Sequence, residues 1–303
     1  MSTFLLAHLS DPHLGPLPRP QIGELANKRA LGLINWQRNR RALHRADVLE
    51  RVVADLKAQN PEHIAVTGDL VNISLAGEYT PARAWLEALG PATDVTLVPG
   101  NHDAYVRRAA QHPQLHWGDY MRGDDAAAPD AAGGSRFPFM RRRGPLALIG
   151  LSSAVPTGPL MATGKLGISQ LQRLAGVLDR AQGDGLFRVV LIHHPPVSKR
   201  SHHLKRLVDA PQFRDILARH GAELVIHGHN HQHCKVELAG PRGAIPAIGV
   251  PSASEAPPGK HAGYNLYRIE SAPGGWRCET ISRGLSGDGE NIVELKRSVA
   301  AAA

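Results

Sequence analysis

Five short clusters of polar side chains each follow an apolar run and carry residue types that bind metal ions. They are SDPH at residues 10–13, GD at 68–69, GNHD at 100–103, HH at 193–194 and GHNH at 228–231. Each cluster lies where a strand is expected to end and the chain to turn. The seven candidate metal ligands are Asp11, His13, Asp69, Asn101, His193, His229 and His231.

This donor set suits Mn, Fe or Zn ions, because it combines oxygen and imidazole ligands and contains no thiolate. Two such ions about 3.5–4 Å apart need one ligand that reaches both, and the two oxygens of a carboxylate can do this. Asp69 is the natural bridge. Two divalent cations neutralise phosphoryl oxygens and generate a hydroxide that attacks phosphorus. His102, beside Asn101, is placed to stabilise charge or to protonate the leaving oxygen.

Apolar runs and amphipathic periodicity define the elements that must position these clusters. Strands that lead into the clusters are expected at residues 4–9, 63–67, 93–98, 187–192 and 223–226. Helices are expected at 47–59, 81–89, 168–182 and 211–220. Further strands are expected at 146–151 and, in a second sheet layer, at 244–250, 264–269 and 276–282. Because ligand sites of α/β sheets lie at the carboxyl ends of strands, the clusters should converge.

The chain of 303 residues shows no internal repeat and no change of composition that would mark a domain boundary. Because the clusters extend from residue 11 to residue 231, one domain must fold around all of them. We therefore expect a single domain over residues 1–298, with a flexible Ala/Asp/Gly-rich loop at 124–135 and a disordered tail at 299–303.

Residues 14–46 form a basic insert in this pattern. The insert begins with several prolines and continues at residues 27–41 with apolar side chains among lysines and arginines. Such an element could touch a membrane surface or the anionic tail of a substrate. It could equally be a basic surface helix whose apolar residues pack on the domain, and the sequence leaves both interpretations open.

A formal net charge of +8 and a pI of about 9.8 favour anionic partners such as phosphorylated metabolites. We expect no stable nucleic acid partner, since aromatic residues make up only 5% of the chain and form no stacking platform. The two cysteines, with no signal peptide pattern and no long apolar stretch, predict a cytoplasmic protein. Contact of residues 27–41 with the inner membrane would make it peripheral to that membrane.

In their order and spacing, the five clusters resemble those of the calcineurin-like metallophosphoesterase family. The resemblance implies an α/β fold: a four-layer α/β/β/α sandwich of two facing β-sheets flanked by helices, with a dinuclear metal site at the strand ends. It also implies how two divalent ions share their ligands. One ion would bind Asp11, His13, Asp69 and His231, and the other Asp69, Asn101, His193 and His229. His102 would remain as the catalytic imidazole.

Four further residues near the clusters have open roles. Asp103 could orient His102 or a loop amide, or it could simply be an acidic residue at a helix N-terminus. His194 follows a ligand and could line the substrate pocket, although a packed or exposed histidine is an equal alternative. His202 and Arg200 lie in a basic loop after His193 and are candidates for contact with the substrate phosphate.

Within this family, the size and the Asn-His-Asp pattern at residues 101–103 resemble those of bacterial phosphodiesterases. The leading hypothesis is a metal-dependent phosphodiesterase in which a metal-bound hydroxide attacks a small phosphorylated substrate. The alternative is a hydrolase of lipid-linked diphosphates, of the UDP-acyl-sugar type used in lipid A precursor metabolism, with the basic insert as its docking element. A non-catalytic scaffold on the same fold would require eroded ligands, and none of the seven is missing.

Overall fold

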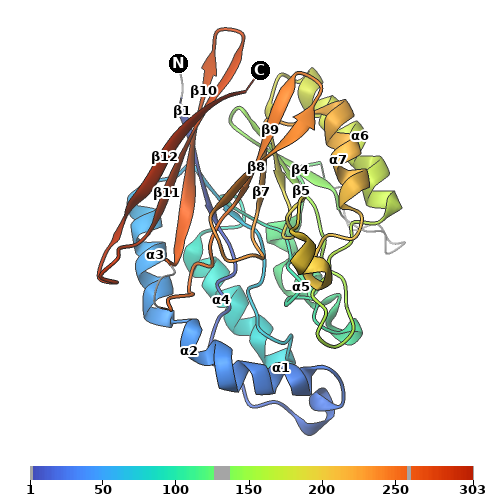
Figure 1. The fold of residues 1–303 in the computed structure, drawn as a ribbon, viewed down its shortest axis with the longest axis vertical. Coiled ribbons are helices and arrows are strands. Elements are labelled where there is room, and N and C mark those ends of the chain that lie inside the picture. The colour runs from blue at the N-terminus through green and yellow to red at the C-terminus, as the bar shows by residue number, and fades with distance from the viewer. Residues whose placement is uncertain (1–2, 126–136, 258–260, 303) are drawn as a thin grey trace.

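The strands that lead into the clusters belong to two facing six-stranded sheets with helices on their outer faces (Figure 1). This computed structural model describes residues 3–125, 137–257 and 261–302. The predicted four-layer α/β/β/α sandwich is confirmed. Among the described residues, no helix is both long and apolar enough to cross a bilayer.

The first sheet has the strand order β12-β11-β10-β1-β2-β3. Its strands are β1 (Thr3–Leu9), β2 (His63–Val66), β3 (Val95–Leu97), β10 (Gly263–Ala272), β11 (Gly275–Leu285) and β12 (Ile292–Ala302). β1, β2 and β3 are parallel, whereas β10, β11 and β12 continue the sheet antiparallel. Because parallel strands end at the same edge, the chain segments after β1, β2 and β3 leave the sheet side by side.

The second sheet has the order β4-β5-β6-β7-β9-β8. Its strands are β4 (Phe139–Arg143), β5 (Leu146–Gly150), β6 (Phe187–Leu191), β7 (Leu224–His227), β8 (Cys234–Gly240) and β9 (Gly243–Gly249). In β5, Leu146 and Leu148 join the core between the sheets, while Ala147 and Ile149 pack toward helices. Burial on both faces explains why these parallel strands are continuous apolar runs.

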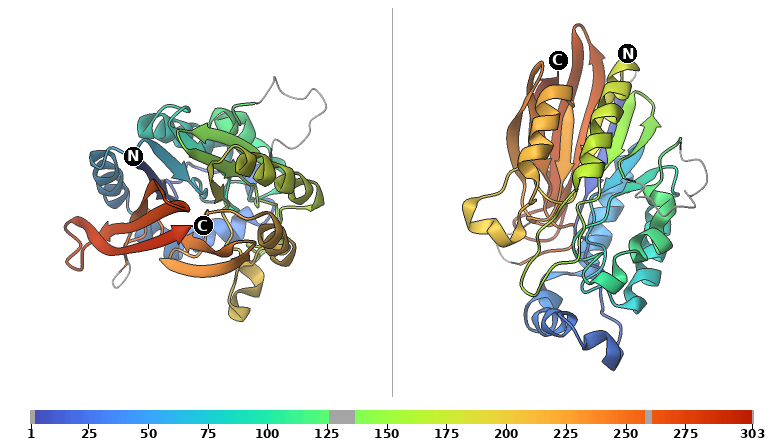
Figure 2. Two further views of the ribbon diagram at one scale, coloured as in Figure 1. Left: turned by 90° about the horizontal axis from the view of Figure 1, so that it is seen from above. Right: turned by 90° about the vertical axis from the view of Figure 1, so that its right-hand side faces the viewer.

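Helices cover the outer face of each sheet. α3 (Ala46–Ala58) and α4 (Tyr79–Leu89) pack on the first sheet, and α6 (Ile168–Gly183) and α7 (Ala210–His220) pack on the second (Figures 1 and 2). The predicted stripe of α6 is buried at Leu171, Leu174 and Leu178. A shorter helix, α5 (His112–Trp117), lies in the stretch between β3 and β4.

The basic insert is helical and lies beyond the strand ends, at the bottom of Figure 1. It contains η1 (Ile22–Leu25), α1 (Arg29–Asn35), the π-helical turn η2 (Trp36–Arg40) and α2 (Arg41–Leu43). Trp36 is buried and packs on the domain, whereas Leu31 and Ile34 are 50% and 46% exposed. The insert therefore combines a packed face with an exposed apolar face.

The structure corrects two expectations near the C-terminus. Residues 299–302 belong to β12 and pair with β11, so the predicted disorder of the tail is wrong for them; residue 303 lies outside the described residues. Residues 264–269 and 276–282 lie in the same sheet as β1, and only 244–250 extend the other sheet. The choice of sheet depends on pairing with distant strands, which local patterns do not encode. Most of the predicted loop at 124–135 lies outside the described residues.

One buried carboxylate joins the turns that follow β2 and β3. The oxygens of Asp103 accept hydrogen bonds from the backbone N–H groups of Gly100, Asp69 and Leu70, each at 2.8 Å, and of Val71 at 3.1 Å. Asp103 is fully buried, so water cannot replace these bonds. The loop-amide interpretation of Asp103 therefore fits the structure, and the helix-end interpretation does not.

Replacing Asp103 with alanine should lower the free energy of unfolding by at least about 3 kcal/mol. The substitution leaves several buried N–H donors without an acceptor, and each costs roughly 1–3 kcal/mol. Urea unfolding of the purified variant measures the loss. Asp215→Ala, at an exposed position of α7, is the matched control and should unfold like the parent protein. Equal stability of the two variants would contradict the role given to Asp103.

Candidate metal centre

Five of the predicted ligands adopt a left-handed backbone conformation that is uncommon outside glycine. The φ angles are 52° at Asp11, 42° at His13, 57° at Asp69, 69° at His229 and 51° at His231. Non-glycine residues at positive φ cost free energy, and they cluster where function requires a particular orientation of the side chain. The sharp turns after β1, β2 and β7 direct these side chains toward one region at the strand ends.

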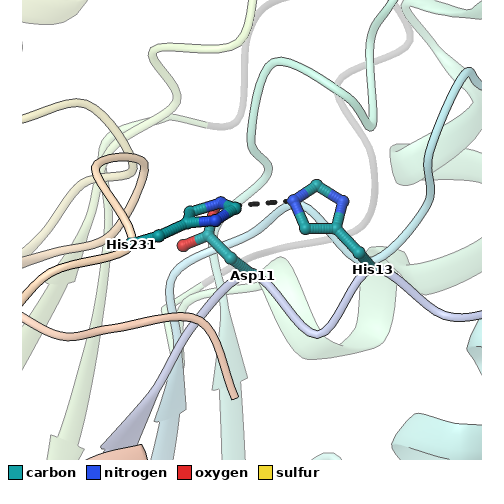
Figure 3. Close-up of side chains that lie close together, drawn as sticks. All are labelled: Asp11, His13 and His231. Atoms are coloured by element: carbon teal, nitrogen blue, oxygen red, sulfur yellow. Dashed lines mark ion pairs between the residues drawn. The ribbon is translucent and has the colours of Figure 1, made fainter. Parts of the chain in front are cut away.

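The first group of candidate ligands contains Asp11 and His13, from the turn after β1, and His231, from the turn after β7 (Figure 3). Oδ1 of Asp11 lies 3.2 Å from Nε2 of His231 and 3.9 Å from Nε2 of His13. This oxygen is buried and has no hydrogen-bond partner among the described residues. An ionised oxygen facing two imidazole nitrogens, without a hydrogen-bond donor of its own, suits a bound cation.

The second group contains Asp69, His193 and His229, with Asn101 beside them. Nε2 of His193 is central to this group. It lies 3.3 Å from Oδ2 of Asp69, 3.2 Å from Oδ1 of Asn101 and 3.2 Å from Nδ1 of His229. All four predicted ligands of the second ion are therefore brought together.

Asp69 lies between the two groups. Its Oδ2 atom is 3.3 Å from Nε2 of His193 and 3.8 Å from Nε2 of His13. Its Oδ1 atom accepts the backbone N–H of His102 at 2.7 Å, which fixes the orientation of the carboxylate. The side chain expected to be the bridge is thus the one that faces both groups.

The ring nitrogen that points away from each group is also paired. Three of the four histidines use that nitrogen to contact a backbone carbonyl oxygen. The contacts are His13 Nδ1 to Val71 O at 3.2 Å, His193 Nδ1 to Thr67 O at 2.6 Å and His229 Nε2 to Lys205 O at 2.9 Å. A carbonyl fixes the tautomer and leaves the lone pair of the other nitrogen free for a metal ion.

The fourth histidine, His231, pairs its Nδ1 atom with the carboxylate of Glu255. Glu255 is buried in the segment after β9. A carboxylate behind a histidine ligand raises the basicity of the imidazole and holds its ring in place. Nothing in the sequence around Glu255 marks it, since only the folded chain brings it to His231.

The surroundings of the two groups hold both carboxylates ionised and two of the four imidazoles neutral. Although burial opposes ionisation, His231 lowers the pKa of Asp11 and His193 lowers that of Asp69. Burial also lowers the pKa of His13 and of His229, so both imidazoles are neutral. His193 and His231 differ. Burial lowers the pKa of His193, but Asp69 outweighs this and raises it to about 9. Burial likewise opposes protonation of His231, but Asp11 and Glu255 raise its pKa. A cation bound at the second group would replace the proton of His193.

His102 lies beside the first group, with its ring centroid 5.0 Å from that of His13. Its Nδ1 atom donates to the carbonyl oxygen of Asn72, and its ring stacks on Tyr105 at a centroid distance of 5.5 Å. Burial and the nearby Arg40 lower the pKa of His102 to about 4. The imidazole is therefore neutral near pH 7, so Nε2 is a hydrogen-bond acceptor, and Nη1 of Arg40 lies 2.9 Å from it.

The structure also brings two residues of the basic insert to these groups, Arg40 and His44. Nη2 of Arg40 lies 2.8 Å from Nε2 of His13, and the ring centroid of His44 lies 4.5 Å from that of His13. Several arginines lie close together at residues 38–41, and no local pattern distinguishes the one that faces the site. For Arg40 and His44, the sequence provided only the general expectation that the insert could contact the substrate.

The structure places the three residues predicted to contact the substrate, His194, His202 and Arg200, in different settings. His194 is buried and uses both ring nitrogens within the protein, with Ser153 Oγ at 2.7 Å and Ala162 O at 3.1 Å, so it is not available to a substrate. His202 lies in η6 (Arg200–Lys205), a segment tied to the site through Lys205 and His229. The side chain of Arg200 lies outside the described residues.

A family model described as calcineurin-like phosphoesterase matches residues 4–233. The chain belongs to the calcineurin-like phosphoesterase family. The matched region contains all seven predicted ligands, and the expectation of a phosphoester hydrolase that uses divalent metal ions is confirmed.

Two relatives narrow the comparison for this phosphoesterase. It is 31% identical over 255 residues to a protein of Synechococcus sp. (strain WH7803) named "Probable cyclic nucleotide phosphodiesterase", covering 82% of this chain and 81% of the relative. A protein with the same descriptive name from Synechococcus sp. (strain ATCC 27144 / PCC 6301 / SAUG 1402/1) is 27% identical over 237 residues, covering 75% of this chain and 79% of the relative.

Solved structures share the fold of this phosphoesterase. A dimetal phosphatase from Danio rerio superimposes with a TM-score of 0.62 at 15% identity, covering 97% of this chain and 99% of that chain. A purple acid phosphatase from yellow lupin seeds gives a TM-score of 0.58 at 11% identity, covering 98% of this chain and 53% of that chain. At these identities the likeness establishes the fold alone.

Replacing Glu255 with glutamine should weaken binding of one metal ion by roughly 10- to 100-fold, because His231 loses the carboxylate behind it. Elemental analysis after dialysis against a weak chelator should find fewer ions per chain than in the parent protein. Glu50→Gln, at an exposed position of α3, is the matched control and should keep the parent content. Equal metal content in both variants would rule out this role for Glu255.

Proposed function

We propose that this phosphoesterase hydrolyses small phosphodiesters at a dinuclear metal centre. The observation that carries the proposal is the position of Asp69, whose Oδ2 atom faces both groups of candidate ligands. The similarity to two proteins named as cyclic nucleotide phosphodiesterases favours a cyclic nucleotide, or a diester of comparable size, as the substrate.

Asp11, His13 and His231 would hold one ion, and Asn101, His193 and His229 the other. Asp69 would be shared between the two. When bound, such ions supply the positive charge that stabilises phosphoryl oxygens and a low-pKa water for attack on phosphorus. Mn, Fe and Zn all accept these ligands.

The chain itself orients the reacting groups. The backbone N–H of His102 holds Oδ1 of Asp69, which leaves Oδ2 for the cations. The carbonyl of Asn72 fixes the tautomer of His102, so Nε2 faces the site as an acceptor. In this state Nε2 of His102 is an acceptor, and Nη1 of Arg40 lies 2.9 Å from it. His102 would have to take up a proton before it could protonate the leaving oxygen.

The exposed face of the basic insert is the observation that favours a second class of substrate. Ile22, Leu31 and Ile34 are 93%, 50% and 46% exposed, and the exposed Arg38 and Arg41 follow them in the same insert. Such a surface suits an acyl chain or the membrane that carries it. A lipid-linked diphosphate hydrolase, peripheral to the membrane, is therefore the alternative.

A substrate panel with Mn-loaded protein separates these functions. It contains a cyclic nucleotide, a glycerophosphodiester, a phosphomonoester and a UDP-acyl-sugar diphosphate. We expect the highest kcat/KM on a soluble diester, and we expect Asp69→Asn to lower that value by roughly a thousandfold through loss of the shared ligand. Asp215→Asn should leave it unchanged.

A preference for the lipid diphosphate would replace the leading substrate with the alternative. If Asp69→Asn retained the full rate on the preferred substrate, the proposed dinuclear mechanism would be lost.

A further inference from the structure

The helical part of the basic insert, residues 29–43, is fixed at both ends to the loops around the metal centre. At its start, Nε of the buried Arg29 donates to the carbonyl oxygen of Ile73 at 3.1 Å. At its end, the backbone N–H of Ala256 donates to Leu43 at 3.0 Å, and that of Arg45 donates to Ser254 at 3.0 Å. The segment is therefore held to these loops by hydrogen bonds at both of its ends.

Close packing holds this segment against the ring that supports His102. A Cβ atom added at Gly32 would lie 2.7 Å from Cγ2 of Ile73 and 2.9 Å from Oη of Tyr105, so only glycine permits this approach. The ammonium group of Lys28 lies 4.0 Å from the ring centroid of Tyr105, which stacks on His102. The insert is thus part of the wall of the site.

Arg40 projects from this segment between two histidines of the site. Its Nη1 atom lies 2.9 Å from Nε2 of His102, and its Nη2 atom lies 2.8 Å from Nε2 of His13. Asp69 and Asp11 act on it electrostatically, but no carboxylate among the described residues forms an ion pair with it. The guanidinium of Arg40 is therefore partly buried with two imidazoles as acceptors and no anion to balance its charge.

A bound metal ion would remove one of the two hydrogen-bond acceptors of Arg40. Nε2 of His13 has one lone pair, which a cation in the first group would take, so Nη2 of Arg40 would then need another acceptor. A phosphoryl oxygen is such an acceptor, and the planar fork of arginine matches the spacing of two phosphate oxygens.

We propose that Arg40 binds a non-bridging oxygen of the substrate's phosphoryl group opposite the metal ions. The proposal rests on the proposed function and extends it: the basic insert supplies a fixed cation that binds the phosphoryl group common to every substrate of the panel. Arg38 and Arg41, on the same segment, are exposed and take no part in this contact.

The test compares Arg40→Ala, Arg40→Lys and the control Arg38→Ala, all loaded with Mn. Calorimetry measures the binding of inorganic phosphate, elemental analysis measures the metal content, and steady-state kinetics measure kcat/KM on the preferred substrate. We expect Arg40→Ala to weaken phosphate binding by roughly 10- to 100-fold and to lower kcat/KM by at least as much. Arg40→Lys should lie between Arg40→Ala and the parent, because it keeps the charge and loses the fork. The metal content of every variant, and all properties of Arg38→Ala, should match the parent protein.

Two results would overturn the proposal. Phosphate binding by Arg40→Ala equal to that of the parent would show that Arg40 does not reach the anion. A loss of metal from Arg40→Ala would show that the residue acts through His13 instead. If the parent protein hydrolyses no ester in the panel, the proposed function fails, and the phosphate-binding comparison still decides the role of Arg40.

Discussion

Two buried carboxylates at the strand ends, Asp11 and Asp69, require positive charge around them, and the rest of the site is arranged to provide it. Asp11 and Asp69 are almost completely shielded from water, and each faces imidazole nitrogens that belong to other strand ends. Removing an ionised carboxylate from water is costly unless opposite charge surrounds it. Divalent cations would supply that charge, and the same charge would attract a phosphate ester. One arrangement would thus account for both the buried negative charge and the proposed affinity for phosphate.

Much of this arrangement could be predicted because the candidate ligands directly follow their strands. An apolar run shows where a strand ends, and the first polar residues beyond it must lie at the edge of the sheet. Asp11, Asp69 and His193 are clear examples, each at most three residues beyond its strand. The positive φ angles at Asp11 and Asp69 are the local result of turning so soon after a strand.

Other parts could not be predicted, since they depend on contacts between distant segments. Arg40 resembles its neighbours in sequence, and the packing of Gly32 on Tyr105 helps to bring its segment close to His102. Glu255 reaches His231 because β9 lies beside β7 in the second sheet. Residues 299–302 form a strand because β11 offers them a partner. In each case the position of the residue depends on a contact with a segment that is distant in the sequence.

The central claim, that Asp69 joins two metal ions, is tested most directly by anomalous diffraction from crystals of Mn-loaded protein. The account predicts two anomalous peaks about 3.5–4 Å apart, one in each group of candidate ligands, with the carboxylate of Asp69 between them. A single peak, or two peaks too far apart for one carboxylate to reach both, would contradict it.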